Sequence, residues 1–134
     1  ILGEHGDSSF PAWSTASIGG IDLKRYPEYD RKKLDVLYQE TRKAAYEIIS
    51  RKGATYYAIG IAVSMLCSTI LKDEHRIYAV STPVKELGGV CLSIPCALGK
   101  KGVVKSVLPP LDANEKKALK HSAQTLDAAY KSVA

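Results

Sequence analysis

The amino-acid sequence predicts a single α+β domain in which helices pack on an antiparallel β-meander. Two observations lead to this prediction. Apolar residues with helical spacing fill positions 30–71, and three short β-rich runs with tight, glycine-containing connections fill positions 77–107. With 134 residues, of which 46% are hydrophobic, the chain is long enough for one hydrophobic core and too short for two comfortable domains.

The first 23 residues are rich in Gly, Ser and Pro, a composition typical of loops. Within them, the run from Thr15 to Ile18 is predicted to form a short strand that ends at Gly19-Gly20. Loops that are held by a rigid scaffold often carry functional residues. We therefore expect chemistry near the start of the chain.

A first amphipathic helix is predicted from about Asp30 to Lys52, with Asp30 as its N-cap and Gly53 as its stop signal. One stripe of apolar or small residues is predicted to face the core: Leu34, Leu37, Tyr38, Thr41, Ala45, Ile48 and Ile49. The charged residues between them are predicted to face water: Arg31, Lys32, Glu40, Arg42, Lys43 and Glu47.

A second helix is predicted from about Ala54 to Leu71. The nineteen residues from Gly53 to Leu71 contain no charge, a length that a transmembrane helix would need. The Gly, Ser, Thr and Tyr residues among them lower the hydrophobicity below what a bilayer requires. We therefore interpret this stretch as the buried central helix of a domain without membrane contact.

The strands of the meander are predicted at Ile77–Ser81, Val90–Ile94 and Val103–Val107. Pro109-Pro110 ends the sheet, and Asp112 with Glu115 forms a capping-box pattern that begins a last helix. The inward face of that helix is predicted to comprise Leu119, Ser122, Leu126, Ala129, Tyr130 and Val133.

The distribution of charge argues against nucleic-acid binding, and the spacing of the cysteines argues against a zinc site. The net charge of +5 is spread over several helices and turns, which argues against a nucleic-acid partner. Cys67, Cys91 and Cys96 lie in apolar surroundings without zinc-like spacing, so we expect buried, inert thiols in a reducing compartment.

The candidate catalytic residue is His5, which lies between Gly3 and Gly6 and is followed by Asp7 and Ser8. Glycine permits positive φ and close approach of another molecule, and imidazole exchanges a proton near neutral pH. From the residues alone, a turn histidine that satisfies a backbone carbonyl is the favoured interpretation.

Two other chemistries use the same residue types. A hydrolytic triad of His5, Asp7 and Ser8 is disfavoured, because triad members are brought together by the fold and the chain has no Gly-x-Ser-x-Gly elbow. A metal site that uses His5 and Asp7 with His75 and His121 has no supporting spacing, so we predict no metal and expect both other histidines at the surface.

The segment Gly-Glu-His-Gly-Asp-Ser-Ser followed by Phe-Pro-Ala-Trp-Ser resembles the active-site histidine segment of NAD-dependent L-lactate dehydrogenases, in the lactate/malate dehydrogenase family. Lys52–Gly60 and Leu92–Cys96 share the resemblance, which extends with looser similarity to Ala134. It implies a fold like the C-terminal domain of that family. Residues 1–134 are then one substrate-binding domain, a fragment without the dinucleotide-binding domain, and the start at Ile1 without Met agrees with this.

The resemblance also implies roles for individual residues. His5 is the proton donor and acceptor, Thr55 and Ala45 line the substrate pocket, and Ile59 lies against the nicotinamide of NAD, which the absent domain mainly binds. From the residues alone, a helix cap is an equally good role for Thr55. Ala45 is then only a helix alanine, and a core position is the favoured role for Ile59. We expect His5, Thr55 and Ala45 to open into one pocket.

The implied function is the interconversion of pyruvate and L-lactate by a cytoplasmic homotetramer. The fragment alone is expected to be inactive, because the family's substrate-binding arginines and the aspartate that orients the histidine precede His5. A malate or other L-2-hydroxyacid dehydrogenase is the alternative within this class. The alternative from another class is a non-catalytic oligomerisation or interaction module that presents tyrosines: Tyr26, Tyr29, Tyr38, Tyr46, Tyr56 and Tyr57. Substrate preference and allosteric activation by a sugar phosphate stay open.

Overall fold

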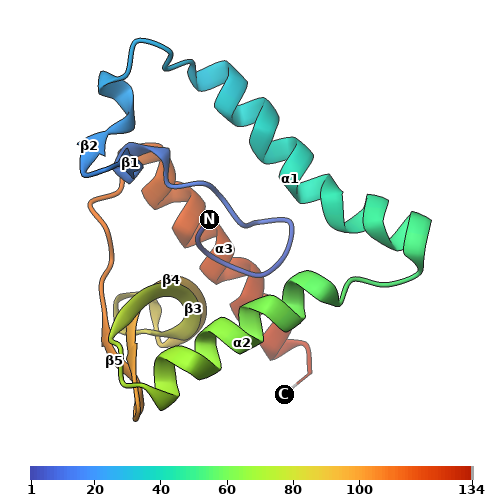
Figure 1. The fold of residues 1–134 in the computed structure, drawn as a ribbon, viewed down its shortest axis with the longest axis vertical. Helices are drawn as coiled ribbons and strands as arrows, with labels where there is room; N and C mark the ends of the chain where they lie inside the picture. The colour runs from blue at the N-terminus through green and yellow to red at the C-terminus, as the bar shows by residue number, and fades with distance from the viewer. Residues whose placement is uncertain (134) are drawn as a thin grey trace.

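The computed structural model describes residues 1–133, which form three α-helices and two antiparallel sheets. The helices are α1 (Arg31–Lys52), α2 (Tyr57–Leu71) and α3 (Ala113–Lys131); the strands are β1 (Ser17–Ile18), β2 (Ile21–Asp22), β3 (Arg76–Val84), β4 (Val90–Gly99) and β5 (Gly102–Ser106). Figure 1 shows α1 and α2 diverging from their short connection, with α3 passing behind α2. The predicted α+β class is confirmed.

The main sheet is the predicted meander, with strand order β3-β4-β5 and both pairs antiparallel. The central strand β4 is longer than predicted, because it continues through Pro95 to Gly99. Proline removes a backbone donor but keeps its carbonyl, and the carbonyl of Pro95 accepts a bond of 2.9 Å from the N–H of Val107. The predicted strand end at Ile94 was therefore wrong.

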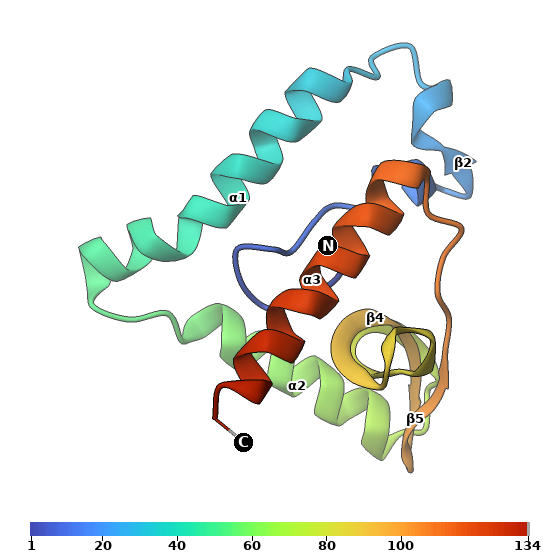
Figure 2. The same cartoon turned by 180° about the vertical axis from the view of Figure 1, so that it is seen from behind.

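The core lies between one face of β4, α3 and the N-terminal segment. Every second residue of β4 points into it, as a half-buried strand requires, and Leu92, Ile94, Cys96 and Leu98 are all buried. Figure 2, seen from behind, shows α3 passing across the molecule near these strands. The rest of the buried cluster is Leu2, Phe10, Val84, Leu111, Leu119 and Ala123.

The predicted ends of α1 and α3 are confirmed. The Asp30 side chain accepts bonds from the first turn of α1, and Gly53 ends that helix with a φ of 85°, a left-handed conformation that glycine adopts without strain. Asp112 and Glu115 form the complete capping box of α3. The helix α2 begins at Tyr57, three residues later than predicted, and has no side-chain cap.

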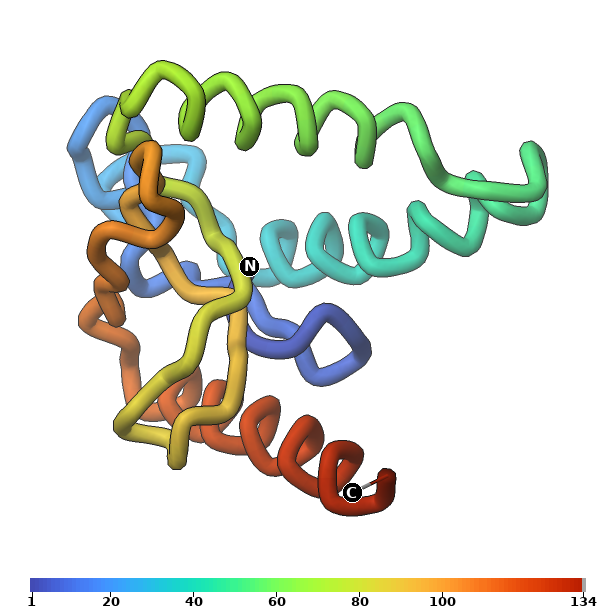
Figure 3. The backbone as a smooth tube through the Cα atoms, turned by 90° about the horizontal axis from the view of Figure 1, so that it is seen from below, coloured from blue at the N-terminus to red at the C-terminus, as the bar shows by residue number. Residues whose placement is uncertain are grey.

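The prediction that α2 is a buried central helix was wrong. Within residues 1–133, Thr69 is its buried residue, and Ile59, Ile61 and Val63 are between 52% and 63% exposed. The helix contacts β4, but α1 diverges from it and leaves its other faces uncovered (Figure 1). Figure 3 shows α2 along one outer side of the molecule. None of the described helices combines the length and the apolar character that a membrane crossing needs.

The apolar faces of α1 and α3 are also covered only in part. Tyr38 is the buried residue of α1, and Leu37, Ile48 and Ile49 on the same predicted stripe are exposed. At the C-terminal end of α3, Tyr130 is 72% exposed, although it was predicted to face inward. The helical spacing identified the stripes correctly, but the described residues do not supply a partner for all of them.

Two of the three cysteines contradict the expectation of buried thiols. Cys67 lies on the uncovered side of α2, and Cys91 lies on β4 at a position that alternates with the buried ones, so both are exposed. Cys96 is buried as expected, and burial raises the pKa of its thiol.

The cap of α3 predicts a pH dependence of stability. Hydrogen bonds from the backbone N–H groups of Glu115 and Asn114 hold the pKa of the Asp112 carboxyl below its ordinary value. The carboxylate therefore stabilises the fold above its ordinary pKa of about 3.9, and this stabilisation is lost as the pH falls through the lowered pKa. We expect Asp112→Ala to lower the Tm near neutral pH, with a difference from the unsubstituted protein that disappears in strong acid.

Thermal unfolding followed by circular dichroism over a pH series checks this expectation. The matched control is Asp127→Ala on the same helix, because Asp127 pairs with the exposed Lys131 and caps nothing. A Tm difference for Asp112→Ala that persists unchanged in strong acid would contradict the explanation.

Candidate active site

The His5 loop, residues 3–9, is closed at its base by backbone hydrogen bonds. Leu2 and Phe10 exchange two bonds of 2.8 and 3.1 Å, and Gly3 exchanges bonds of 3.0 and 2.8 Å with Ser93 of β4. Fixing a loop in one conformation costs entropy. The two bonds between Gly3 and Ser93 offset part of this cost and fix the start of the loop on the central strand. His5 lies between these anchor points, on the exposed part of the loop.

Gly3 lets the loop approach α3 closely. Its φ is 96°, and a Cβ atom there would lie 2.6 Å from the Oγ of Ser122, closer than real Cβ contacts. The same Ser122 hydroxyl accepts a hydrogen bond of 2.6 Å from the backbone N–H of Glu4. Gly6 has no positive φ, so only one of the two glycines has the conformational role that the sequence suggested for both.

Ser8 and Asp7 do not form a triad with His5. Their side chains bind other residues and so hold the loop in place. The hydroxyl of Ser8 donates to the carboxylate of Glu4 and lies 3.1 Å from the Oγ of Ser122. Asp7 accepts a bond of 2.9 Å from Arg42. Because both side chains are engaged away from His5, the geometry disfavours a hydrolytic triad.

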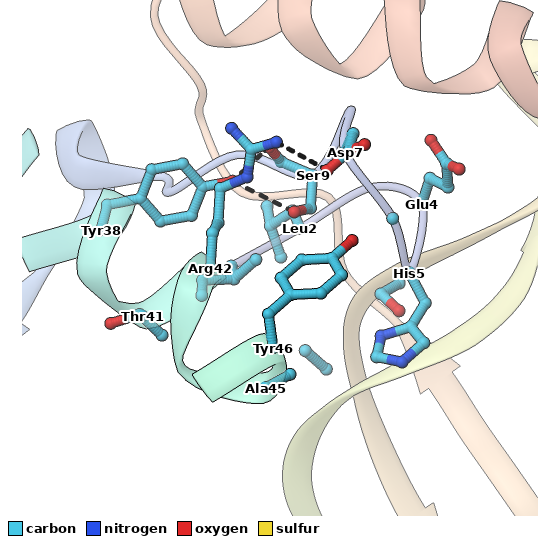
Figure 4. A pocket seen from close by; sticks show the side chains of 14 residues that line it. Leu2, Glu4, His5, Asp7, Ser9, Tyr38, Thr41, Arg42, Ala45 and Tyr46 are labelled. Carbon is cyan, nitrogen blue, oxygen red and sulfur yellow. Dashed lines mark hydrogen bonds and ion pairs between the residues drawn. The ribbon is translucent and has the colours of Figure 1, made fainter. Parts of the chain in front are cut away.

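The helix α1 meets the other side of the loop through Tyr38 and Arg42 (Figure 4). The Tyr38 hydroxyl donates to the carbonyl of Ser9, and the Arg42 guanidinium forms the ion pair with Asp7. Arg42 was predicted to face water, but its side chain is only 32% exposed. The signal that could have identified it is a lone cation on the helix face that also carries Tyr38 and Ala45.

A cavity of about 480 Å³ lies between the loop, α1 and the sheet. In Figure 4 the side chains of His5, Arg42 and Tyr46 come from the loop and from α1 toward this space. The complete lining is Ile1, Leu2, Glu4, His5, Gly6, Asp7, Ser9, Tyr38, Thr41, Arg42, Ala45, Tyr46, Ala79 and Ser93. A proton-exchanging group therefore opens into a partly apolar hollow, which suits general acid–base chemistry on a small molecule.

The structure brings two of the four sequence-predicted site residues together. His5 and Ala45 line the cavity. Thr55 is exposed in the connection between α1 and α2, and Ile59 is 57% exposed on α2, so neither belongs to this lining. We expected His5, Thr55 and Ala45 to share one pocket. In the structure of residues 1–133, His5 and Ala45 share it and Thr55 does not.

The structural alternatives for Thr55 and Ile59 are not observed either. The N-cap position of α2 is Tyr56, and the helix has no side-chain cap, so Thr55 does not cap it. Ile59 is not a core residue, because more than half of it is exposed. Both side chains are therefore free of the structural roles that their positions suggested.

His75 and His121 are exposed, as predicted. His75 lies 3.1 Å from the carboxylate of Asp73, just after the C-terminal end of α2, and His121 lies on α3. Among residues 1–133, no three His, Cys, Asp or Glu side chains are grouped so that they could hold a metal ion.

A second attachment fixes the segment that follows the loop. Ser14 donates its backbone N–H (2.8 Å) and its hydroxyl to the carboxylate of Glu115, which also accepts from the N–H of Asp112 at 3.1 Å. Glu115 is only 4% exposed, and a buried carboxylate requires such donors. The capping pattern identified Glu115, but the partner Ser14 could not be predicted from sequence spacing.

The comparison with known protein families decides the family. Residues 1–134 match the family described as the alpha/beta C-terminal domain of lactate/malate dehydrogenase. The chain belongs to this family. Within the lactate/malate dehydrogenase domain, the His5 loop is thus attached to the sheet by Gly3 and to α3 by Ser122.

Individual relatives agree with the family. The chain is 41% identical over 135 residues to L-lactate dehydrogenase of Moorella thermoacetica and 41% identical over 143 residues to L-lactate dehydrogenase of Kosmotoga olearia. These alignments cover 94% and 99% of the chain but 43% and 44% of the relatives. The chain therefore spans less than half the length of the curated relatives that it matches.

A solved structure shows the same arrangement of elements. It is a lactate dehydrogenase from a Medee basin deep-sea metagenome library, with a TM-score of 0.89 and 38% sequence identity. The match covers 96% of the chain and 43% of that protein. The lactate/malate dehydrogenase C-terminal fold is therefore established by sequence and by structure.

Proposed function

We propose that this domain supplies the proton donor and part of the substrate pocket of an NAD-dependent L-lactate dehydrogenase. The observation that carries the proposal is that the exposed His5 side chain and Ala45 line the same cavity. His5 lies on a loop that is attached to both β4 and α3. The family membership and the L-lactate dehydrogenase relatives support the same reaction class.

His5 performs the proton transfer in this proposal. In the direction of reduction, the imidazolium donates its proton to the carbonyl oxygen of a 2-oxo acid, which becomes a hydroxyl group. In the reverse direction, the neutral imidazole accepts the hydroxyl proton. Positioned acid–base groups of this kind contribute roughly 10²–10⁴ in rate. A fixed loop keeps the imidazole within reach of the position that the carbonyl oxygen occupies.

The residues on α2 fit one face of a nicotinamide. Ile59 presents an exposed apolar side chain on a helix without charge, which suits the flat face of a nicotinamide ring that must be shielded from water. When bound, NADH supplies the hydride that adds to the substrate's carbonyl carbon. Ile59 would support the ring in this proposal, and Thr55, which precedes α2 outside the His5 cavity, would approach the substrate from that side.

Ala45 leaves room for the side chain of the substrate in this proposal. Its methyl side chain leaves room beside His5 for a substrate with a small side chain of its own, such as the methyl group of pyruvate. Pocket size by itself discriminates modestly, because one methylene changes binding by about 1–3 kcal/mol.

We further propose that the domain acts together with a dinucleotide-binding domain in a homotetramer. Its relatives are more than twice as long as the matched region. The uncovered apolar residues of α1 and α2 favour further contacts, because apolar patches of this kind mark interaction surfaces. The same surfaces favour the second candidate function, an assembly module without catalytic activity.

Steady-state kinetics on the full-length protein tests the proposal. With NADH, we expect kcat/KM for pyruvate to exceed that for oxaloacetate and for branched 2-oxo acids by at least about tenfold, the effect of a misfit worth ~1.4 kcal/mol in the pocket. Residues 1–134 alone should not oxidise NADH. A preference for oxaloacetate would indicate a malate dehydrogenase, and no turnover with any 2-oxo acid would favour the assembly module.

A further inference from the structure

We propose that Arg42 is a positioning residue, whose ion pair with Asp7 holds the His5 loop against α1 so that His5 faces Ala45 across the cavity. This inference rests on the proposed role of His5. It adds a residue that the sequence pattern assigned to the solvent-facing side of α1. Arg42 acts on the reaction through the loop and does not contact the reacting atoms.

The contacts of Arg42 connect one face of α1 to the loop. Tyr38, Arg42, Ala45 and Tyr46 follow one another at helical spacing, so they share that face. Tyr38 bonds the backbone of Ser9, and one turn later Arg42 reaches Asp7 with an Nη2–Oδ1 distance of 2.9 Å. The next turn places Ala45 and Tyr46 on the cavity.

Arg42 is itself held in place on the helix. Its guanidinium lies 5.9 Å from the centre of the Tyr38 ring, within the range of a cation–π contact. Its Nη1 lies 3.4 Å from the Oε1 of Gln39. The fork of the guanidinium therefore reaches Asp7 from a supported position, which a flexible surface side chain would lack.

The effect on His5 follows from the short distance along the chain. Asp7 is two residues from His5, and its side chain is 88% exposed, so little else in residues 1–133 restrains it. The helix α1 diverges from α2 and approaches the loop through Tyr38 and Arg42 (Figures 1 and 4). Loss of the ion pair would let the loop and the Ala45 wall of the cavity move apart.

An ion pair with one exposed partner contributes little to global stability. Its influence is expected in the geometry of the site, where a displacement of about 1 Å can reduce the rate by ~10². A positioning role therefore predicts a large kinetic effect with a small change in Tm. A purely structural role predicts the reverse.

The test uses steady-state kinetics of the full-length protein with NADH and pyruvate. We expect Arg42→Ala to reduce kcat by roughly 10–100-fold with little change in the KM for pyruvate or in Tm. Arg42→Lys should restore part of the loss, because the charge remains. Asp7→Asn should reproduce the loss, and the double variant should be no worse than either single one, since both remove the same contact.

Two further measurements make the result specific. Hydrogen exchange should be faster at the amides of Gly6 to Ser9 in Arg42→Ala, because the loop has lost an attachment. Arg51→Ala is the matched control: Arg51 also forms an ion pair on α1, with Glu47, but it is 78% exposed and does not contact the loop. This control should keep the kinetic constants and the exchange rates.

The outcomes separate this inference from the proposed function. Unchanged kcat in Arg42→Ala, together with an inactive His5→Gln variant, overturns the role of Arg42 and leaves the proposed function intact. A raised KM for pyruvate with retained kcat means that Arg42 binds the substrate directly, which also overturns a positioning role. Retained activity in His5→Gln overturns both.

Discussion

Replacing His5 with glutamine in the full-length protein should lower kcat for pyruvate reduction by about 10²–10⁴, with a smaller effect on KM. Glutamine keeps a polar side chain of similar length, but its amide does not ionise near neutral pH and cannot transfer a proton. The His5 side chain is exposed and makes no contribution to the core cluster. The Tm should therefore stay close to that of the unsubstituted protein.

The control for this variant is His75→Gln. His75 is exposed, pairs with Asp73 and lies outside the cavity that His5 lines, so its replacement should leave kcat unchanged. Stopped-flow measurement of NADH absorbance with saturating pyruvate separates the chemical step from product release. If His5→Gln retained more than a tenth of the wild-type rate in that step, the proton-transfer role would be refuted.

The second large effect is expected for Leu92→Ala, which should lower the free energy of unfolding by about 2–5 kcal/mol. Leu92 is fully buried on β4, so the substitution removes apolar contacts and leaves a cavity. A domain of this size is typically stable by only ~5–15 kcal/mol. The loss would therefore be a large part of the total.

The consequence of Leu92→Ala should extend to the site. Ser93, the next residue, exchanges both backbone bonds with Gly3 at the base of the His5 loop. Urea unfolding measures the free energy, with Leu71→Ala as the matched control because Leu71 is 84% exposed on α2. Surface changes of this kind usually stay within about 0.5 kcal/mol, and an equal effect of the two substitutions would contradict the assignment of the core.

Local patterns were sufficient for most of the secondary structure. The caps at Asp30 and Asp112, the stop at Gly53 and the order of the meander act over a few residues, so sequence spacing contains the physical cause. The same reasoning was wrong about the end of the central strand at Ile94, because the carbonyl of Pro95 still pairs inside the sheet. It was also wrong about α2, because hydrophobicity indicates a tendency to be buried but not which partner covers the helix.

The arrangement of the site depends on contacts between residues far apart in the chain. Ser122 accepts from Glu4 across 118 positions, Glu115 holds Ser14 across 101, and Arg42 reaches Asp7 across 35. No sequence period connects such pairs, since each forms only after the sheet and helices have packed. The residue types around His5 predicted a proton-transfer site, and they indicated the family that the family comparison confirms. The packed structure decided that Ala45 shares a cavity with His5, that Thr55 lies outside it, and that Arg42 belongs to the loop, because side-chain proximity is set by the fold and not by the order of residues.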